Sequence, residues 1–589
     1  MLLTQALPCP AAVDNDADAQ DQKIAQLIAQ LGDPEYTVRE RAQQDLAKHG
    51  FAAFDALTAA ENSDDIEVAA QARYLVKLIR VDWTQESDPP QVRQILKDYE
   101  LQSEVARLAR IKGLADLPDD IGMEFLCRLA RFEQSHLLSK QAALAVMNEP
   151  LPPGDDAWNK RSKTIARTLD RSNRTAARWL KTYVQSRSDA EAALVEWKKL
   201  AQLEEQTLEQ YPQQSQNQLV LQLLRQQVDT LDRLGRPEDA TDAMRKMVQI
   251  ERGDSQSLTE LVEWLVGRNA WSVIDDVAAK FSGNFDADAL LLYTLAQARL
   301  AQGNEALAEE AASKALKINA DKGAEHLLVA FRLAERGLMK WSDREYRFVI
   351  DLGPPHADAV IKARSLLAEN LHDRLEDLAA AEVLKGLVDG MDKDRAVNRA
   401  VNQQGRDAAA IKSRMNFFFA AHQATLGDRA KQKELLDKGL AEDPTDADVL
   451  IALYEFTDKE PAERKKVVEL IKKAGEQQRA IIEEAPDDPT AYNQLAWLIA
   501  NTEGDFDDAI RLSHKSIELK RAGGYLDTLG HCYAAKGDFE NAVRYQTEAS
   551  KLDPHSQAIT RKLEVFRKGL AERQQQSPKP GDEKTGEKK

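Results

Sequence analysis

The 589-residue sequence has no run of about 18 apolar residues, few runs of β-branched residues and only three cysteines. The first absence excludes a membrane-spanning helix, and the second leaves no indication of a β-sheet, because strands are rich in β-branched side chains. Three cysteines do not discriminate between oxidising and reducing compartments. Since Ala, Leu, Gln, Glu, Arg and Lys dominate instead, we predict an all-α fold.

The sequence also lacks the short motifs that carry catalytic chemistry. It contains no phosphate-binding Gly-Lys loop, no dinucleotide-binding glycine triplet, no serine nucleophile elbow and no metal-binding helix with paired histidines. The run from Asp14 to Asp18 has the first spacings of a calcium loop, but Ala19 and Ala25 replace its turn glycine and its bidentate glutamate. His531 and Cys532 are adjacent on an expected helix and therefore point in different directions. We predict no catalytic residue, no metal and no cofactor.

Basic residues are the minority among the charged ones. The chain carries 98 acidic and 80 basic side chains, which gives a formal net charge of −18. Such a balance disfavours non-specific binding to nucleic acid, so no nucleic-acid partner is expected. A basic or neutral partner is easier to accommodate.

A 34-residue pattern of small and large apolar residues lies near the C-terminus. Between Gly523 and Ser556 it comprises Leu526, Leu529, Gly530, Tyr533, Gly537, Ala542, Ala549 and Pro554. This pattern resembles the tetratricopeptide repeat (TPR), in which two helices pack closely where the small residues lie. The resemblance implies stacked α-α pairs in a superhelical solenoid, whose concave surface binds a protein or peptide.

Partial copies of the same pattern occur upstream. They span residues 489–522, 413–446, 323–356 and 289–322, and a weaker copy centres on Gly235, Ala240 and Met247. Gly427, Gly337 and Gly303 occupy the position that Gly537 has in the last copy. We therefore expect divergent TPR units over much of the chain.

A different repeat opens the chain. Between Lys23 and Arg80 apolar residues recur at a 30-residue step: Ile24 with Phe54, Leu27 with Leu57, Val38 with Val68, Ala42 with Ala72 and Leu46 with Val76. Each half reads as two short amphipathic helices, broken in the first half at Gly32-Asp33-Pro34. The run from Asp33 to Arg39 resembles part of a HEAT repeat. Helical spacing continues to Asn148, so we expect HEAT-like pairs before the TPR units.

Pro, Gly and polar clusters suggest the domain boundaries. We expect the following segments: an unstructured terminus or signal remnant at 1–20, HEAT-like repeats at 21–148, a linker at 149–157, a helical, TPR-like solenoid at 158–388, a polar break at 389–408, a C-terminal TPR block at 409–572 and a disordered tail at 573–589. The apolar start, Met1 to Val13, resembles the end of a secretory signal but has no positive n-region. It favours export, with a cytoplasmic protein as the alternative.

The TPR resemblance assigns certain positions of each first helix to the concave surface. These are Asn493, Trp497 and Asn501 in one unit, Asp527 and His531 in the next, and Tyr293 and Phe331 in earlier units. Trp497 is the best single anchor, because tryptophan is enriched among the residues that dominate binding. The alternative for each aromatic residue is packing against a neighbouring helix.

One segment is basic although the chain is acidic. Residues 160–187 contain nine basic residues and one acid, Asp170, and the arginines at 167, 171, 174 and 178 follow helical steps. Arg167, Arg171, Arg174 and Arg178 thus suggest a cationic stripe that docks an acidic or phosphorylated partner. The alternative is a solvated face that pairs with acidic neighbours.

The sequence as a whole favours a non-enzymatic scaffold that holds a protein or peptide in an extended groove. Two other classes stay open: an enzyme with an α-superhelical body, and a nucleic-acid-binding helical repeat that uses residues 160–187.

Overall fold

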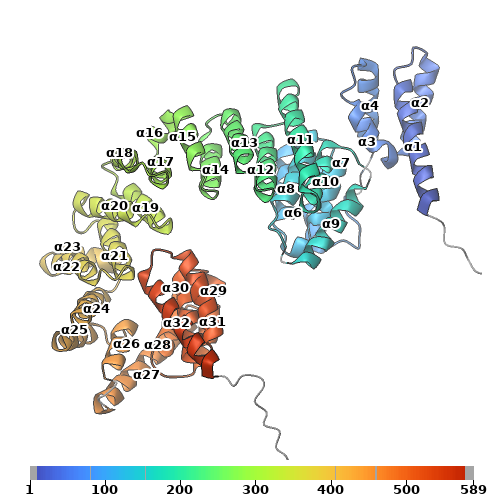
Figure 1. The fold of residues 1–589 in the computed structure, drawn as a ribbon. Helices are drawn as coiled ribbons and strands as arrows, with labels where there is room; N and C mark the ends of the chain where they lie inside the picture. Colours follow the sequence, from blue (N-terminus) through green and yellow to red (C-terminus); the bar gives the residue numbers. More distant parts are fainter. Residues whose placement is uncertain are drawn as a thin grey trace, which may run out of the picture. The chain divides into compact units, whose positions relative to one another are not determined.

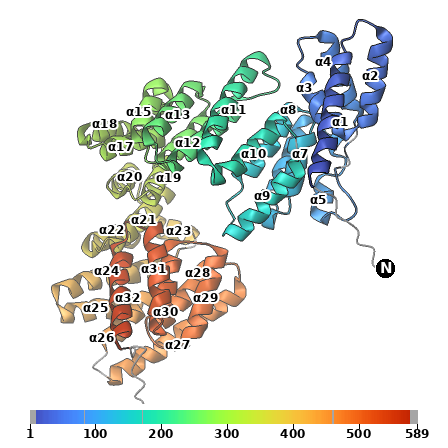
Figure 2. The ribbon, with the colours of Figure 1, turned by 45° about the vertical axis from the view of Figure 1, so that its right-hand side comes forward.

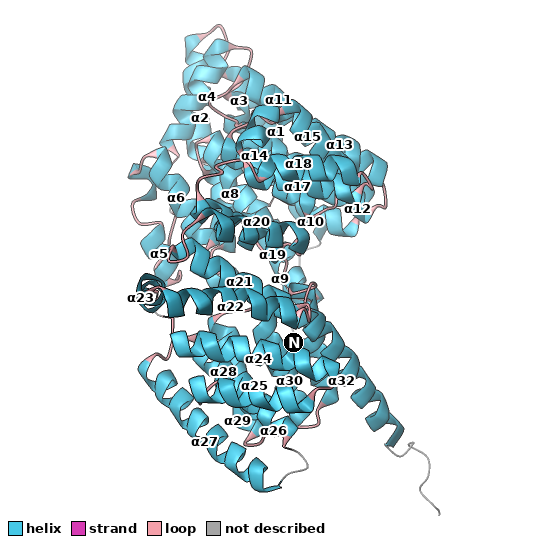
Figure 3. Ribbon diagram, turned by 90° about the vertical axis from the view of Figure 1, so that its left-hand side faces the viewer, coloured by secondary structure: helices cyan, strands magenta, loops and turns pink. Residues whose placement is uncertain are grey.

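The computed structural model describes residues 10–576 except Arg80, Asp82, Pro153, Arg171, Gly405 and residues 458–460. Within these residues the fold consists of thirty-two α-helices and two 3-10 turns, with no strand, which confirms the all-α prediction (Figures 1 and 3). None of the described helices is both long and apolar enough to cross a membrane. The chain divides into two compact units, Met1–Asn284 (unit 1) and Phe285–Lys589 (unit 2).

The helices of unit 1 are short and follow one another closely. They are α1 (Pro10–Gln30), α2 (Tyr36–His49), α3 (Phe51–Ala60), α4 (Ile66–Leu78), α5 (Pro90–Ile95), α6 (Glu104–Ala115), α7 (Met123–Phe132), α8 (His136–Asn148), α9 (Asp155–Leu169), α10 (Thr175–Ser188), α11 (Ala190–Gln210), α12 (Asn217–Arg233), α13 (Pro237–Ile250), α14 (Ser255–Val266) and α15 (Trp271–Lys280). The 3-10 turns are Tyr99–Leu101 and Pro118–Asp120, and α16 (Ser282–Ala287) crosses into unit 2.

The helices of unit 2 form successive pairs. They are α17 (Ala289–Ala301), α18 (Glu305–Ala315), α19 (Gly323–Glu335), α20 (Met339–Leu352), α21 (Asp358–Asp373), α22 (Asp377–Lys393), α23 (Arg395–Gln403), α24 (Ala408–Leu426), α25 (Arg429–Glu442), α26 (Ala447–Phe456), α27 (Pro461–Glu484), α28 (Pro489–Ala500), α29 (Phe506–Leu519), α30 (Gly523–Ala535), α31 (Phe539–Leu552) and α32 (Gln557–Gln576). Every predicted TPR unit of this region coincides with one such pair.

The first four helices form the two pairs that the 30-residue step predicts. Ile24 and Leu46 of the first pair share one apolar core with Phe54 and Leu57 of the second, and all four are buried. The break between α1 and α2 falls at the predicted Gly-Asp-Pro segment. Their resemblance to HEAT repeats stays a prediction.

The turn between the two helices of a pair has one recurring backbone geometry. Gly235, Gly303, Gly337, Gly427 and Gly537 all have positive φ, between 68° and 82°. Glycine favours this left-handed conformation because it has no Cβ, and the turn closes each first helix in the manner of a Schellman motif. For example, the Asp538 N–H donates to the Tyr533 carbonyl at 2.9 Å. The five glycines named by the sequence pattern therefore perform the same structural task.

Two further pairs use the same turn without glycine. Asn269 between α14 and α15 has φ 56°, and Leu375 between α21 and α22 has φ 63°. Each is followed by the same backbone hydrogen bond: the Glu376 N–H donates to the Leu371 carbonyl at 2.9 Å. A left-handed leucine is uncommon, because its branched side chain crowds the backbone. The pair α21–α22 therefore belongs to the repeat series, although its sequence does not show the pattern.

Several predicted boundaries differ from the helix bounds. Helix α1 begins at Pro10, inside the segment expected to be an unstructured terminus or a signal remnant. Proline suits the first turn of a helix, and no further Gly or Pro follows before Gly32. The 149–157 segment is a loop within unit 1, since α7 contacts α9 and α8 contacts α10 across it. Arg161 of α9 also donates to the Pro150 carbonyl at 2.9 Å.

The 389–408 break is likewise largely helical. Helix α22 continues to Lys393, α23 follows it, and α22 contacts α24 beyond the break. Val397 and Val401 of α23 are buried in the same core as α21 and α22, which explains why the helix persists among polar residues. The predicted tail at 573–589 begins inside α32, and residues 577–589 lie outside the described residues.

The last helix of unit 2 makes a contact that is distant in sequence. Helix α32 packs on α31, as the next first helix of the series would, and it also contacts α21 (Figure 2). Ile559, Leu563 and Phe566 are its buried residues. The first helices at the two ends of the α21–α32 segment therefore lie side by side.

Candidate interaction face

Five of the first helices of unit 2 are joined by a continuous line of side-chain contacts. It consists of Glu369, Arg414, Asp448, Trp497 and His531, one residue from each of α21, α24, α26, α28 and α30. We call these five residues the first-helix row. Each touches the next through a hydrogen bond, an ion pair or a ring contact, and two of them were predicted as groove residues.

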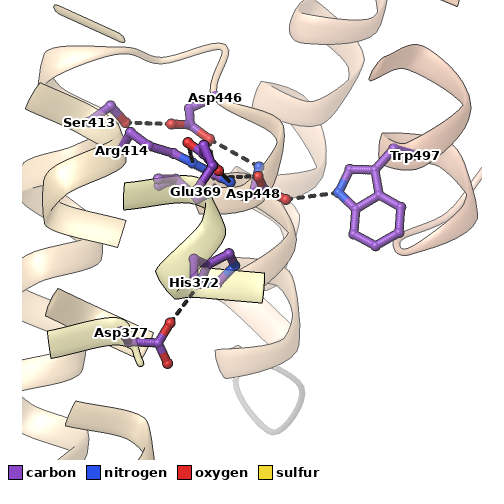
Figure 4. A network of polar contacts seen from close by, with 9 residues as sticks. Glu369, His372, Asp377, Ser413, Arg414, Asp446, Asp448 and Trp497 are labelled. Atoms are coloured by element: carbon purple, nitrogen blue, oxygen red, sulfur yellow. Dashed lines mark hydrogen bonds and ion pairs between the residues drawn. The ribbon is translucent and has the colours of Figure 1, made fainter. Parts of the chain in front are cut away.

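Arg414 is the centre of the row (Figure 4). Its Nε and Nη2 donate to the two oxygens of Glu369 at 3.0 and 2.7 Å, and Nη1 donates to Asp448. The guanidinium also lies 5.2 Å and 4.7 Å from the ring centres of Phe417 and Phe418. Burial alone would lower the pKa of Arg414, but the carboxylates of Glu369 and Asp448 outweigh it and hold the pKa well above its usual value. One side chain thus ties three first helices together.

Asp448 contacts both Arg414 and Trp497 and so connects these two members of the row. Its Oδ1 accepts a hydrogen bond from the Trp497 indole Nε1 at 2.8 Å (Figure 4). Burial would raise the pKa of Asp448, yet Arg414 and the indole lower it below its usual value. Nearby Asp446 caps α26 and accepts from Ser413 Oγ at 2.8 Å, while burial raises its pKa. The carboxylate of Asp448 is therefore ionised and fixed in place.

His372 lies on α21 beside this network. Its Nδ1 is 2.6 Å from Asp377 Oδ1, and its ring stacks on Phe418 with the ring centres 4.7 Å apart. The Asp377 contact orients the imidazole, and the stacking fixes its plane. The imidazole of His372 therefore lies in a fixed orientation next to the Glu369–Arg414 pair (Figure 4).

The row ends in a buried histidine. The rings of Trp497 and His531 are 4.7 Å apart, and His531 Nδ1 is 2.7 Å from Asn501 Oδ1. Asn501 in turn donates from Nδ2 to the Trp497 carbonyl at 2.9 Å. Burial lowers the pKa of His531 well below its ordinary value, so the ring is neutral at pH 7. Asn501, Trp497 and His531 thus lie together, but His531, predicted to face the groove, is buried instead.

Carboxylates accumulate beyond the end of the row. Burial raises the pKa of Asp527 to about 6. A hydrogen bond from Gln546 and the charge of Lys562 on α32 lower this pKa, whereas the carboxylates of Asp373 and Asp553 raise it. Burial also raises the pKa of Asp373 and of Asp553. Seven carboxylates named in this network stand against two cationic side chains, Arg414 and Lys562; the seven are Glu369, Asp373, Asp377, Asp446, Asp448, Asp527 and Asp553. The region is therefore electronegative.

The other predicted groove residues have different surroundings. Tyr293 was predicted to face the groove, which is wrong: it is fully buried and its hydroxyl donates to Glu345 Oε1 at 2.5 Å. An aromatic ring at this position fills the core between pairs instead. Phe331 on α19 is 42% exposed and remains available to a partner. Asn493 on α28 is half-buried, and its side-chain oxygen has no hydrogen-bond partner in the described part of the chain.

The predicted cationic stripe is not one surface. Residues 170–174 separate α9 from α10, so the arginines leave a common helical face. Arg167 is exposed and pairs with Glu124 at 2.8 Å, and Arg178 pairs with Glu196 at 2.5 Å. Arg174 is buried, its Nη1 donates to the Arg131 carbonyl at 2.9 Å, and burial lowers its pKa to about 10. Arg171 lies outside the described residues. The prediction of one stripe failed because the spacing of the arginines does not reveal the break between α9 and α10.

Glu369, Arg414 and Asp448 are the residues that sequence reasoning missed. Glu369 belongs to the pair whose turn has Leu375 in place of glycine, so no repeat pattern pointed to α21. Arg414 sits in a predicted unit and precedes Phe417 and Phe418, and this arginine–aromatic spacing on one helix was the available clue.

Comparison with known proteins supports the repeat assignment. Residues 524–556 match the family model of the tetratricopeptide repeat, which confirms the last predicted unit. No curated protein matches the sequence. Matching solved structures include the P58(IPK) TPR domain (16% identity, 55% of this chain and 99% of that chain, TM-score 0.17) and yeast Tom70 (15%, 71% and 86%, 0.22). A third is the APC/C hetero-tetramer Cut9–Hcn1 (12%, 81% and 94%, 0.25).

Proposed function

We propose that this chain is a non-enzymatic protein-interaction scaffold, and that the first-helix row of unit 2 binds a basic segment of a protein or peptide partner. The single observation that carries the proposal is the excess of carboxylates along the row and at Asp527. The TPR unit at 524–556 supports the general role, since such repeats present their first helices to ligands.

The charge argument explains why the segment is basic. Asp527 has a raised pKa because burial is not offset by enough nearby positive charge. A lysine or arginine side chain placed beside Asp527 and Asp373 would supply that charge and form charge-assisted hydrogen bonds. An acidic segment would add to the repulsion, so the row discriminates by charge sign.

Trp497 supplies the apolar part of the proposed contact. It is half-buried, so part of its ring remains accessible, while its indole N–H is fixed by Asp448. A ring held in one orientation loses little conformational entropy on binding. Asn493 and Phe331 are proposed as further contacts, because the first is a half-buried residue one turn before Trp497 on α28 and the second is exposed.

The test uses the full chain and two fluorescent peptides of equal length and opposite charge. We expect the Lys/Arg-rich peptide to bind in fluorescence anisotropy, with an affinity that falls as salt is added, and the Asp/Glu-rich peptide not to bind. Asp527→Asn should weaken the binding of the basic peptide.

The matched control is Glu518→Gln, which removes an exposed carboxylate from α29, a second helix. It should leave the affinity unchanged. Equal affinity for both peptides, or equal losses in Asp527→Asn and Glu518→Gln, would refute the proposal.

A further inference from the structure

Unit 1 contains a cavity that the proposed function does not use. It has a volume of about 610 Å³ and is lined by residues of α1, α3, α7, α8, α10 and α11 and of the loops beside them. Sites for small organic ligands have volumes of roughly 300–1,000 Å³. Ala52, Ala56, Ala59 and Leu203 give the cavity an apolar wall, and Arg131, Lys140 and Arg174 give it a cationic part.

Arg174 is the unusual member of this lining. Only 7% of its surface is exposed, and its planar guanidinium lies 5.5 Å from the centre of the Phe54 ring. Nη1 donates to the Arg131 carbonyl at 2.9 Å. Nε and Nη2 have no hydrogen-bond partner among the residues that the structure describes. These two nitrogens form one edge of the guanidinium, and that edge matches the two oxygens of a carboxylate.

The charges around the cavity leave Arg174 without a counter-ion. Arg131 lies 3.6 Å and 3.8 Å from the carboxylates of Asp55 and Asp170, and Lys140 lies 2.7 Å from Glu204. No ion pair involves Arg174 within the described ranges, and burial lowers its pKa despite the more distant Glu133, Asp55 and Glu61. A buried guanidinium with two unused N–H groups is costly unless another group supplies acceptors.

The start of α10 adds a second anion-binding element to the same wall. Asn173, Arg174 and Thr175 line the cavity, and no side chain caps the first turn of this 14-residue helix. The free N–H groups and the helix dipole favour a negative charge at this end.

We infer that the cavity binds a small molecule that carries one carboxylate, with the Nε–Nη2 edge of Arg174 as the anchor and the alanines of α3 against its apolar body. A single carboxylate suits the site because Arg174 has no ion pair of its own among the described residues, and two of its N–H groups lack an acceptor there. A dianionic phosphate would bring a second negative charge close to Asp55 and Asp170, which already share Arg131. This inference concerns unit 1 and does not depend on the proposed function of unit 2.

The experiment titrates the purified full chain with sodium hexanoate and with hexanamide, its uncharged analogue, and follows binding by saturation-transfer NMR. We expect saturable binding of hexanoate and none of hexanamide. Inorganic phosphate, at the same ionic strength, should compete weakly or not at all. Arg174→Lys keeps the charge but loses the bidentate edge, so it should weaken hexanoate binding by about tenfold or more.

A second variant keeps Arg174 intact in case its replacement disturbs folding. Ala59→Leu adds a side chain at an exposed position that lines the cavity, and Ala70→Leu makes the same change at an exposed position of α4 outside it. Ala59→Leu should reduce hexanoate binding, and Ala70→Leu should not. The inference is overturned if hexanoate does not bind saturably, if hexanamide binds equally well, or if Ala59→Leu and Ala70→Leu behave alike.

Discussion

The hydrogen bond between Trp497 and Asp448 provides the sharpest test of the first-helix row. Trp497→Phe keeps an aromatic ring at this position but removes the indole N–H that donates to Asp448 at 2.8 Å. Hydrogen bonds to charged groups contribute about 1.5–3 kcal/mol, so we expect a loss of unfolding free energy in that range. Asp448→Asn removes the charge that faces Arg414 as well; because this pair is only half-buried, the loss should stay below the roughly 3–5 kcal/mol of a fully buried pair.

The two changes should not be additive, because both remove the same contact. A double-mutant cycle should give a coupling energy of at least about 1 kcal/mol. Since a chain of many repeats does not unfold in one step, the free energies are best taken from native-state hydrogen exchange of amides in α26 and α28. Trp197→Phe is the matched control: Trp197 is fully buried, and its indole nitrogen has no hydrogen-bond partner among the described residues. Coupling of Trp497→Phe to Asp448→Asn within about 0.5 kcal/mol of zero would refute the row as a connected network.

Three further predictions concern stability. Leu529→Ala, at a fully buried position of α30, should cost roughly 2–5 kcal/mol and speed hydrogen exchange in α30–α32 before α1–α4, whereas a uniform effect would contradict nearest-neighbour stability. The pKa of Asp527 in the folded state is about 6, above its ordinary value of 3.8, so the folded state binds the proton more tightly than the unfolded state. The resulting stabilisation is present at low pH and should be lost as the pH rises through 6. The urea midpoint measured against pH should show this loss, and Asp527→Asn should remove it. Gly303→Ala should cost about 1–2 kcal/mol by thermal melting, because φ is 81° and no atom lies within 4 Å of the added methyl, whereas Gly524→Ala, equally uncrowded but within a helix, should not destabilise.

The turn residues show how far the sequence determines the fold. Gly235, Gly303 and Gly337 mark the ends of first helices because a left-handed turn selects glycine, and the pattern could therefore be found. Leu375 adopts the same left-handed conformation although it is not a glycine. The sequence pattern therefore did not identify α21 as the first helix of a repeat, and it did not identify Glu369 as a site residue. The surrounding packing, not the local preference, fixes this turn.

The candidate site was predictable only in part. Trp497, Asn501 and His531 were found because they occupy fixed positions within two adjacent repeats. Their partner Asp448 lies on a short helix before the long α27, where the repeat pattern is absent. The stripe of arginines failed for a related reason, because helical spacing carries no information once Asp170 and the following residues interrupt the helix.

The contact between α32 and α21 has a consequence for the order in which the protein matures. Ten helices separate the two, whereas most pairs of a repeat protein meet their neighbours as soon as they are made. During synthesis α21 emerges early and must wait for α32 to complete its surroundings. Until then a nascent chain exposes the part of α21 that α32 contacts, and a ribosome stalled before α32 would leave it exposed.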